Sequence, residues 1–106
     1  MRFDALELAL AIVSRLRPIL SLVRRHDARL HKQIRDAGAS IVMHLGEGNR
    51  RRGQDRTYLF TVASGSAEEV RLGLRIAVAW GYVSEAAHEA LEYLDRFLAV
   101  TWKLTH

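Results

Sequence analysis

The sequence predicts an all-α protein, folded as an antiparallel up-down-up-down four-helix bundle. Four segments carry apolar residues at the three- and four-residue steps of an amphipathic helix. The connections between them are mostly short, and short connections make consecutive helices antiparallel. The chain has 106 residues, of which 49% are hydrophobic. Residues 1–106 are therefore expected to form a single domain around one core.

The first predicted helix spans about residues 4–25. Its apolar stripe is expected to consist of Leu6, Leu10, Val13, Leu16, Leu20 and Val23. Pro18 lies inside this pattern and removes one backbone hydrogen-bond donor. Because the pattern resumes beyond the proline, we expect one bent helix and not two.

The second predicted helix spans about residues 28–46, with Asp27 as its N-cap. Its stripe consists of Leu30, Ile34, Ala37, Ile41 and Leu45. Gly46 and Gly48 are predicted to end this helix, because glycine readily adopts the backbone conformation that follows a helix C-terminus.

The third predicted helix spans about residues 55–80, and Gly81 follows it. One stripe consists of Leu59, Ala63, Ser66, Val70, Gly73 and Ala77, and a second of Tyr58, Val62, Gly65, Glu69, Leu72 and Ile76. Glu69 is the one acidic residue on the second stripe, and a semi-buried carboxylate would need a partner. We therefore expect a structural ion pair between Glu69 and Arg35 of the second helix.

The fourth predicted helix spans about residues 85–104, with Ser84 as its N-cap. Its two stripes are Leu91, Leu94, Leu98 and Trp102, and Ala86, Ala90, Tyr93, Phe97, Val100 and Leu104. A helix in a monomeric bundle needs only one apolar stripe. We therefore expect self-association, with an oligomer interface formed by Tyr93, Phe97, Val100 and Trp102. One broad stripe that faces the core is the alternative.

Positive charge is concentrated in one part of the chain, whose net charge is +4 overall. Residues 24–56 hold nine basic and four acidic residues, a net charge of +5. The candidate nucleic-acid-binding residues are Arg50, Arg51, Arg52 and Arg56 in and after the connection between the second and third helices, and Arg24, Arg25, Arg29 and Lys32 near the connection between the first and second. Guanidinium groups suit phosphate, and a basic patch is the usual mark of a polyanion-binding surface. In an up-down bundle these two regions lie at opposite ends, so an oligomer would repeat each as a ring.

Other chemistries find little support in the sequence. Four residues separate Gly48 from Gly53, as in a phosphate-binding P-loop, but the Lys-Ser/Thr that completes this motif and the preceding strand are missing. There is no cysteine, and Glu85-Ala-Ala-His88 has no second Glu-x-x-His to complete a two-metal site. Ser40, Ser64 and Ser66 have no suggestive histidine neighbour. We expect neither cofactor, metal nor enzymatic activity.

No signal peptide or membrane-spanning run is recognisable, so a cytoplasmic protein without membrane partners is expected.

The segment from Leu30 to Tyr82 resembles a bacterial family of small four-helix bundles. The similarity rests on Leu30, Gln33, Arg35, Ala37, Ser40-Ile41, Glu47-Gly48, Arg51 or Arg52, Tyr58-Leu59-Phe60, Ala63, Gly65-Ser66, Glu69, Ala77 or Ala79, and Gly81-Tyr82. The family contains proteins encoded in intervening sequences of 23S ribosomal RNA genes and the accessory variability proteins of diversity-generating retroelements. The resemblance implies a homopentameric ring with a basic, nucleic-acid-binding surface and no enzymatic activity. For the retroelement members it also implies a reverse transcriptase as partner.

Two hypotheses for function remain open at this point. The first is an oligomeric bundle that binds RNA or an RNA–DNA hybrid, as an accessory to a reverse transcriptase. The second is a protein-interaction scaffold whose basic face docks an acidic protein. Salt-dependent binding of nucleic acid separates them.

Overall fold

The computed structural model describes residues 4–106. The side chain of Ala86, which belongs to one predicted stripe of the fourth helix, lies outside the described part. The described chain forms four α-helices and no strand: α1 (Asp4–His26), α2 (Ala28–Asn49), α3 (Gly53–Ala79) and α4 (Ala86–Thr105). The prediction of an all-α fold with four helices is confirmed.

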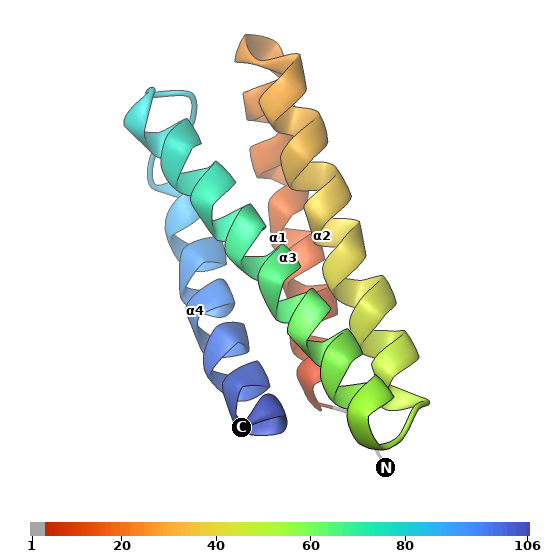
Figure 1. Cartoon of the computed structure of the whole chain (residues 1–106). Helices are drawn as coiled ribbons and strands as arrows, with labels where there is room; N and C mark the ends of the chain where they lie inside the picture. Colours follow the sequence, from red (N-terminus) through yellow and green to blue (C-terminus); the bar gives the residue numbers. More distant parts are fainter. Residues whose placement is uncertain (1–3) are drawn as a thin grey trace.

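Successive helices run in opposite directions, as expected (Figure 1). Each helix packs against its neighbours in sequence, and α4 returns to pack against α1. The lower end of the molecule in Figure 1 holds the start of α1, the end of α4 and the connection of residues 50–52. The upper end holds Asp27, between α1 and α2, and residues 80–85, between α3 and α4. The molecule measures 42 × 22 × 21 Å, so its long axis separates the two ends.

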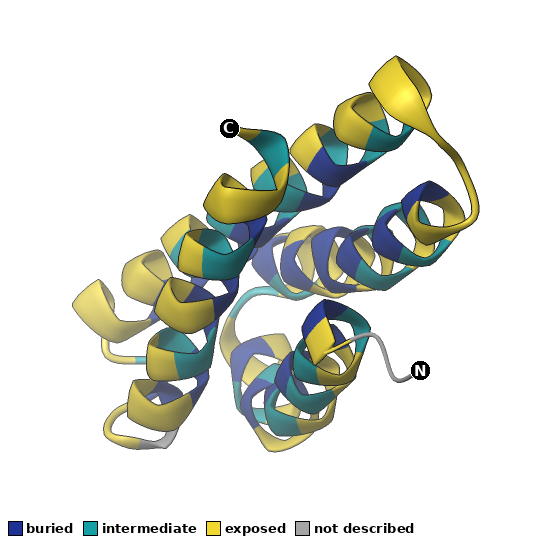
Figure 2. Ribbon diagram, turned by 90° about the horizontal axis from the view of Figure 1, so that it is seen from below, coloured by how far each residue is buried: buried dark blue, intermediate teal, exposed yellow. Residues whose placement is uncertain are grey.

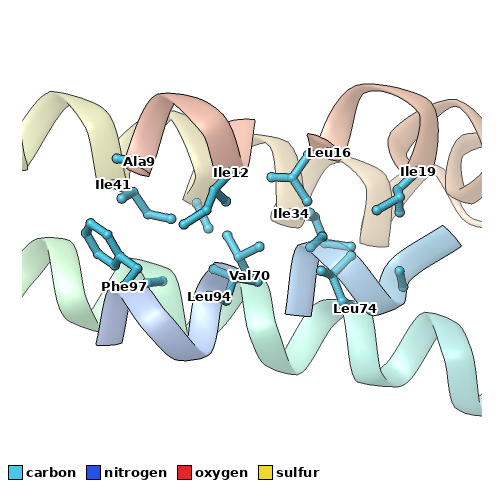
Figure 3. Packing of buried hydrophobic residues seen from close by; sticks show 14 of the residues in the cluster. Ala9, Ile12, Leu16, Ile19, Ile34, Ile41, Val70, Leu74, Leu94 and Phe97 are labelled. Atoms are coloured by element: carbon cyan, nitrogen blue, oxygen red, sulfur yellow. The ribbon is translucent and has the colours of Figure 1, made fainter. Parts of the chain in front are cut away.

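The core lies along the bundle axis, where all four helices turn their buried faces inward (Figure 2). The predicted stripe of α2 is confirmed, because all five of its residues are buried. Figure 3 shows Ile34 and Ile41 of this stripe across from Val70 and Leu74 of α3. In α3 the inward stripe includes Ala63, Val70, Gly73 and Ala77 as predicted, but Phe60 and Ala67 replace Leu59 and Ser66.

The predicted stripe of α1 is partly correct: Leu16 and Val23 are buried as predicted, but Leu6, Leu10, Val13 and Leu20 are not. The buried residues are Ala5, Ala9, Ile12, Leu16, Ile19 and Val23. Leu10 and Val13 are instead 46% and 37% exposed. Apolar residues cover a wide arc of α1, and two of its three alanines, Ala5 and Ala9, occupy inward positions. A pattern that follows only the larger side chains therefore selects the flank of this helix.

Residues from both predicted stripes of α4 face the core together, whereas Trp102 and Leu104 are 61% and 38% exposed. The buried residues of α4 are Ala87, Ala90, Leu94, Phe97 and Thr101. The buried Thr101 hydroxyl donates to the carbonyl oxygens of Phe97 and Leu98, both at 3.1 Å, so it is satisfied within the helix. Phe97 is 0% exposed and lies within the protomer core (Figure 3). It cannot contact another subunit, and its place in the predicted interface is corrected.

Helix α2 does not end at Gly46 or Gly48 but continues to Asn49. Gly48 is buried against α3, and a Cβ atom added there would lie 2.8 Å from Cδ1 of Phe60. This glycine is therefore required for the close approach of α2 to α3. It does not stop the helix, because helical packing on Phe60 outweighs its local flexibility.

The signals at Asp27 and Gly81 behave as the sequence predicts, but the one at Ser84 does not. Asp27 caps α2, since its side chain accepts a hydrogen bond from the Leu30 backbone N–H at 2.9 Å. Helix α1 continues through Pro18, which lies on its exposed side. Gly81 has a φ of +77° after the end of α3, and the Tyr82 N–H donates to the Ala77 carbonyl, which forms a Schellman motif. Ser84 is not the cap of α4, which begins after Glu85 without a side-chain cap bond.

Candidate nucleic-acid interface

The predicted basic residues lie near both ends of the bundle. Arg50, Arg51 and Arg52 lie in the connection at the lower end, and Arg56 follows in the first turns of α3. At the upper end, Arg24 and Arg25 end α1, while Arg29 and Lys32 begin α2. The expected separation of the two groups along the chain's long axis is therefore present.

Three of these eight side chains already have partners. Lys32 Nζ lies 2.6 Å from Asp36 Oδ2. Arg51 Nη2 lies 3.2 Å from Glu47 Oε1, and the Arg56 guanidinium lies 4.9 Å from the centre of the Phe60 ring. Within residues 4–106 the other five form no ion pair: Arg24, Arg25, Arg29, Arg50 and Arg52. These five are the guanidinium groups most available to an anionic ligand.

The pairing of Lys32 also affects its acidic partner. The side-chain hydrogen bond from Lys32, aided by the positive charges of Lys32, Arg35 and His31, lowers the pKa of the Asp36 carboxyl below its usual 3.8. Asp36 is therefore ionised at neutral pH and offsets the charge of Lys32. Lys32 is accordingly a weaker candidate for phosphate contact than the arginines around it.

A groove between α1 and α2 gathers basic residues that the sequence analysis did not group together. Arg17 and Arg24 line it from α1, and His31 and Arg35 line it from α2. Ser14 and Ser21 add two hydroxyl groups on the same side of α1. Arg17 and Arg24 have no carboxylate partner among the described residues. We call this the α1–α2 groove.

Arg17 and His31 are the groove residues that sequence reasoning missed. A signal exists for the α1 side, because Ser14, Arg17, Ser21 and Arg24 follow one another at three- and four-residue steps and so share a helix face. Which face of α2 meets this side of α1 depends on the packing of the two helices. The sequence pattern alone does not contain that information.

A second groove lies on the same seam at the lower end. It is lined by Leu6 of α1, by α2 residues that include Val42 and Gly46, and by Arg50 in the connection that follows α2. Arg24 near one end and Arg50 near the other therefore border the same α1–α2 seam. The two basic regions remain at opposite ends of the bundle, as expected, and the seam runs between them.

The predicted ion pair between Arg35 and Glu69 does not form. Arg35 Nη1 lies 3.6 Å from Asp36 Oδ1, and its side chain lines the α1–α2 groove. Glu69 is exposed on the outer face of α3 and has no ion-pair partner in the described chain. The carboxylate is solvated there, so it does not need the partner that a buried one would.

A polar bridge joins α2 to α3 halfway along the bundle. Ser40 Oγ lies 2.7 Å from Ser66 Oγ and 3.0 Å from His44 Nδ1. The expectation that Ser40 has no histidine neighbour is therefore wrong. His44 Nδ1 also lies 2.9 Å from the Ser40 carbonyl oxygen, which can only accept, so a protonated Nδ1 satisfies both contacts. In that form Nδ1 cannot take the Ser40 proton, and the arrangement is a structural bridge.

The predicted interface residues of α4 do not share one face. Tyr93 lies on the side of α4 that faces α1, where the Arg15 guanidinium carbon is 4.1 Å from the centre of the Tyr93 ring. Trp102 borders a groove with Gly65 of α3, on the opposite side. Val100 is seven residues after Tyr93, close to two helical turns, and so lies on the same side of α4 as Tyr93. With Phe97 in the core, these residues cannot form the single interface that was expected.

The second predicted stripe of α3 forms an exposed face that is largely apolar but also carries Glu69. Tyr58, Leu72 and Ile76 are 67%, 49% and 41% exposed. Helical spacing puts them on one side of α3, opposite its buried residues. Gly65 lies on this side as well, with open space where a Cβ would be. We call this the outer face of α3.

Among residues 4–106, no three His, Asp or Glu side chains come together in a way that could hold a metal ion. None of the four helices is both long and apolar enough to cross a membrane.

Comparison with known proteins places this bundle in a family. The model of the family described as 23S rRNA-intervening sequence protein matches residues 2–98. A crystal structure of a protein of unknown function from the S23 ribosomal protein family of Bacteroides thetaiotaomicron has the same fold, with a TM-score of 0.86 and 15% sequence identity. That match covers 95% of this chain and 97% of the other. No curated protein matches the chain. Because the family match extends over most of its length, the chain belongs to the 23S rRNA-intervening sequence protein family.

Proposed function

We propose that the protein is a non-catalytic, oligomeric bundle that binds RNA or an RNA–DNA hybrid along its α1–α2 seam. One observation carries this proposal: Arg17, Arg24 and Arg35, from two helices, line a single groove. Arginine is suited to such a site because its planar guanidinium can bind phosphate oxygens in pairs. Contacts of this kind give affinity without reading the base sequence.

The dimensions of the groove fit this role. Its α1 side runs from Ser14 to Arg24, which is ~15 Å at the helical rise per residue. One strand of a duplex has a phosphate for about every 3.4 Å of axis. The groove is therefore long enough to meet several consecutive phosphates.

The proposal includes self-association into a ring, which the family resemblance implies to be a pentamer. The outer face of α3 supports it, because exposed apolar side chains gathered on one face are typical of protein–protein contacts. Assembly would repeat the α1–α2 groove around the ring. The resemblance to retroelement accessory proteins adds a reverse transcriptase to the proposed partners.

The test is the salt dependence of binding to a labelled RNA strand, measured by fluorescence anisotropy. The variant Arg17→Gln/Arg24→Gln/Arg35→Gln removes the three groove charges. Its matched control, Arg75→Gln/Arg96→Gln/Lys103→Gln, removes three charges from exposed positions of α3 and α4. Each lost phosphate contact on a single strand reduces the slope of log K against log salt by about 0.7. The groove variant should therefore flatten the slope by about 2, and the control should change it far less.

Two outcomes contradict the proposal. If wild-type protein binds neither RNA nor an RNA–DNA hybrid at low salt, nucleic-acid binding is excluded, and an acidic protein becomes the better partner. If both triple variants flatten the slope equally, binding depends on overall charge and not on the α1–α2 groove.

A further inference from the structure

The upper end of the bundle holds an aromatic cluster that the proposed function does not use. The Tyr82 ring stacks on the His26 ring, with 4.9 Å between centroids and 1° between planes. The Trp80 ring meets Tyr82 edge to face at 5.7 Å. Trp80 is 63% exposed, so at least one face of its indole ring is open to solvent.

This cluster holds its shape through the turn after α3. Trp80 is the C-cap residue of that helix, and the Schellman motif fixes Gly81 and Tyr82 behind it. Tyr82 also packs partly against the core. Trp80 thus projects from a turn whose backbone is held by hydrogen bonds to the last turn of α3.

Two arginines precede the histidine of this cluster in the sequence. His26 ends α1 directly after Arg24 and Arg25, which are both exposed and form no ion pair within residues 4–106. Asp27, the carboxylate next to them, is engaged as the N-cap of α2. Arg24 also lines the α1–α2 groove, two residues before His26, so the groove ends at the same end of the bundle as the aromatic rings.

We propose that Trp80, on its support of Tyr82 and His26, is a stacking site for an unpaired nucleotide base of a strand whose phosphates lie in the α1–α2 groove. An open indole face next to arginines is the combination that binds single-stranded nucleic acid. Paired bases are stacked inside a duplex and cannot reach such a ring. This inference rests on the proposed function and narrows its ligand to single-stranded nucleic acid or to an unpaired end.

The experiment follows the emission of Trp80 during binding. The chain has two tryptophans, so Trp102→Phe leaves Trp80 as the only one. This protein is titrated at low salt with a single-stranded RNA and with the duplex of the same sequence. We expect the single strand to quench Trp80 emission and the duplex to leave it nearly unchanged.

Affinity measurements supply the second readout. In the otherwise native chain, Trp80→Leu keeps an apolar side chain but removes the aromatic face, and should weaken single-strand binding about fivefold to hundredfold. Trp80→Tyr should restore most of the affinity. Trp102→Leu is the matched control, since Trp102 is similarly exposed, at 61%, but lies near the lower end of α4. The salt slope should not change in the Trp80 variants.

The two proposals can fail separately. If Trp80→Leu binds as tightly as wild type while Arg17→Gln/Arg24→Gln/Arg35→Gln does not, the stacking site is wrong and groove binding stands. An unquenched Trp80 in the bound state leads to the same conclusion. Absence of any nucleic-acid binding at low salt overturns both proposals together.

Discussion

Gly46 and Gly48 lie two residues apart in α2, yet a methyl group added at each would meet different surroundings. At Gly48 the new Cβ would lie 2.8 and 2.9 Å from two carbons of the Phe60 ring and 3.1 Å from Leu59 Cβ. Phe60 is 1% exposed, so its ring has little room to move. At Gly46 the new methyl would have no neighbour within 4 Å.

This contrast predicts opposite effects of one substitution. Gly48→Ala should lower the free energy of unfolding by about 1–3 kcal/mol, because it overpacks the contact between α2 and α3. Gly46→Ala should raise it by about 0.5–1 kcal/mol, because alanine favours the helix more than glycine does. Urea unfolding followed by circular dichroism measures both. A Gly48→Ala protein at least as stable as Gly46→Ala would show that α2 and α3 do not meet this closely.

The residues that carried the family resemblance have mostly structural roles. Ser40 and Ser66 hydrogen-bond across α2 and α3, Gly48 admits the Phe60 ring, and Gly81 forms the turn after α3. This explains why the resemblance predicts the fold well. It says less about a ligand, because Arg17 and Trp80, on which the two proposals depend, lie outside the matching residues.

At the scale of whole helices, the predictability of each element follows from its side chains. The stripe of α2 could be predicted because most of its large apolar residues lie on one face; Met43, at 70% exposed, is off it. In α1, Ala5 and Ala9 face the core, while Leu10 and Val13 are substantially exposed. A stripe predicted from the larger side chains alone therefore lies partly on the flank of the helix. The end of α2 was misjudged because packing on Phe60 outweighs the preference of Gly48 for a turn.

The exposed apolar side of α3 leads to a prediction about assembly. Leu72→Asp/Ile76→Asp places two charges on the outer face of α3 and should reduce the mass of the assembly to that of smaller species. Light scattering measures the mass, and circular dichroism checks that the helices persist. Both positions are substantially exposed in the single chain, so the fold should tolerate the charges.

Trp102→Asp provides the comparison on α4. If this substitution splits the assembly and the α3 variant does not, the subunits meet through the side of α4 near Trp102. A wild-type protein that is monomeric at all concentrations would contradict the proposed ring altogether.

At the scale of the whole molecule, the two basic regions share the α1–α2 seam. The distance along α1 from Arg24 to Leu6 is ~27 Å, most of the length of the bundle. A single strand laid along the seam could therefore meet the groove arginines and the connection of residues 50–52 at the same time.

This arrangement predicts additive effects on salt dependence. Arg50→Ala/Arg51→Ala/Arg52→Ala should flatten the salt slope for a strand long enough to cover the seam, and combining it with the groove variant should flatten it further. Arg51 should contribute least, because it already pairs with Glu47. With a strand too short to span the seam, the two sets of charges should no longer add. Fluorescence anisotropy of the labelled strands at several salt concentrations measures these slopes. If the effects of the two variants on the slope add equally for long and short strands, the shared seam is wrong.

Only part of the candidate site could be predicted from the sequence. The excess of positive charge over residues 24–56 correctly indicated both basic regions. Arg17 was missed because it lies in a segment with little net charge, and its role depends on which face of α2 meets α1. The stacking of His26 on Tyr82 joins residues 56 positions apart, and no local pattern contains such a contact.

Helix α1 begins and α4 ends at the lower end of the bundle, while Trp80 lies at the upper end, across a 42 Å axis. This placement of both chain ends opposite Trp80 has a practical value for single-molecule and biosensor work. A protein anchored to a chip by an affinity handle fused at either terminus would present the Trp80 end to the flowing solution. Immobilised molecules would then share one orientation, and the anchor would obstruct residues 50–52 long before it disturbed the aromatic rings.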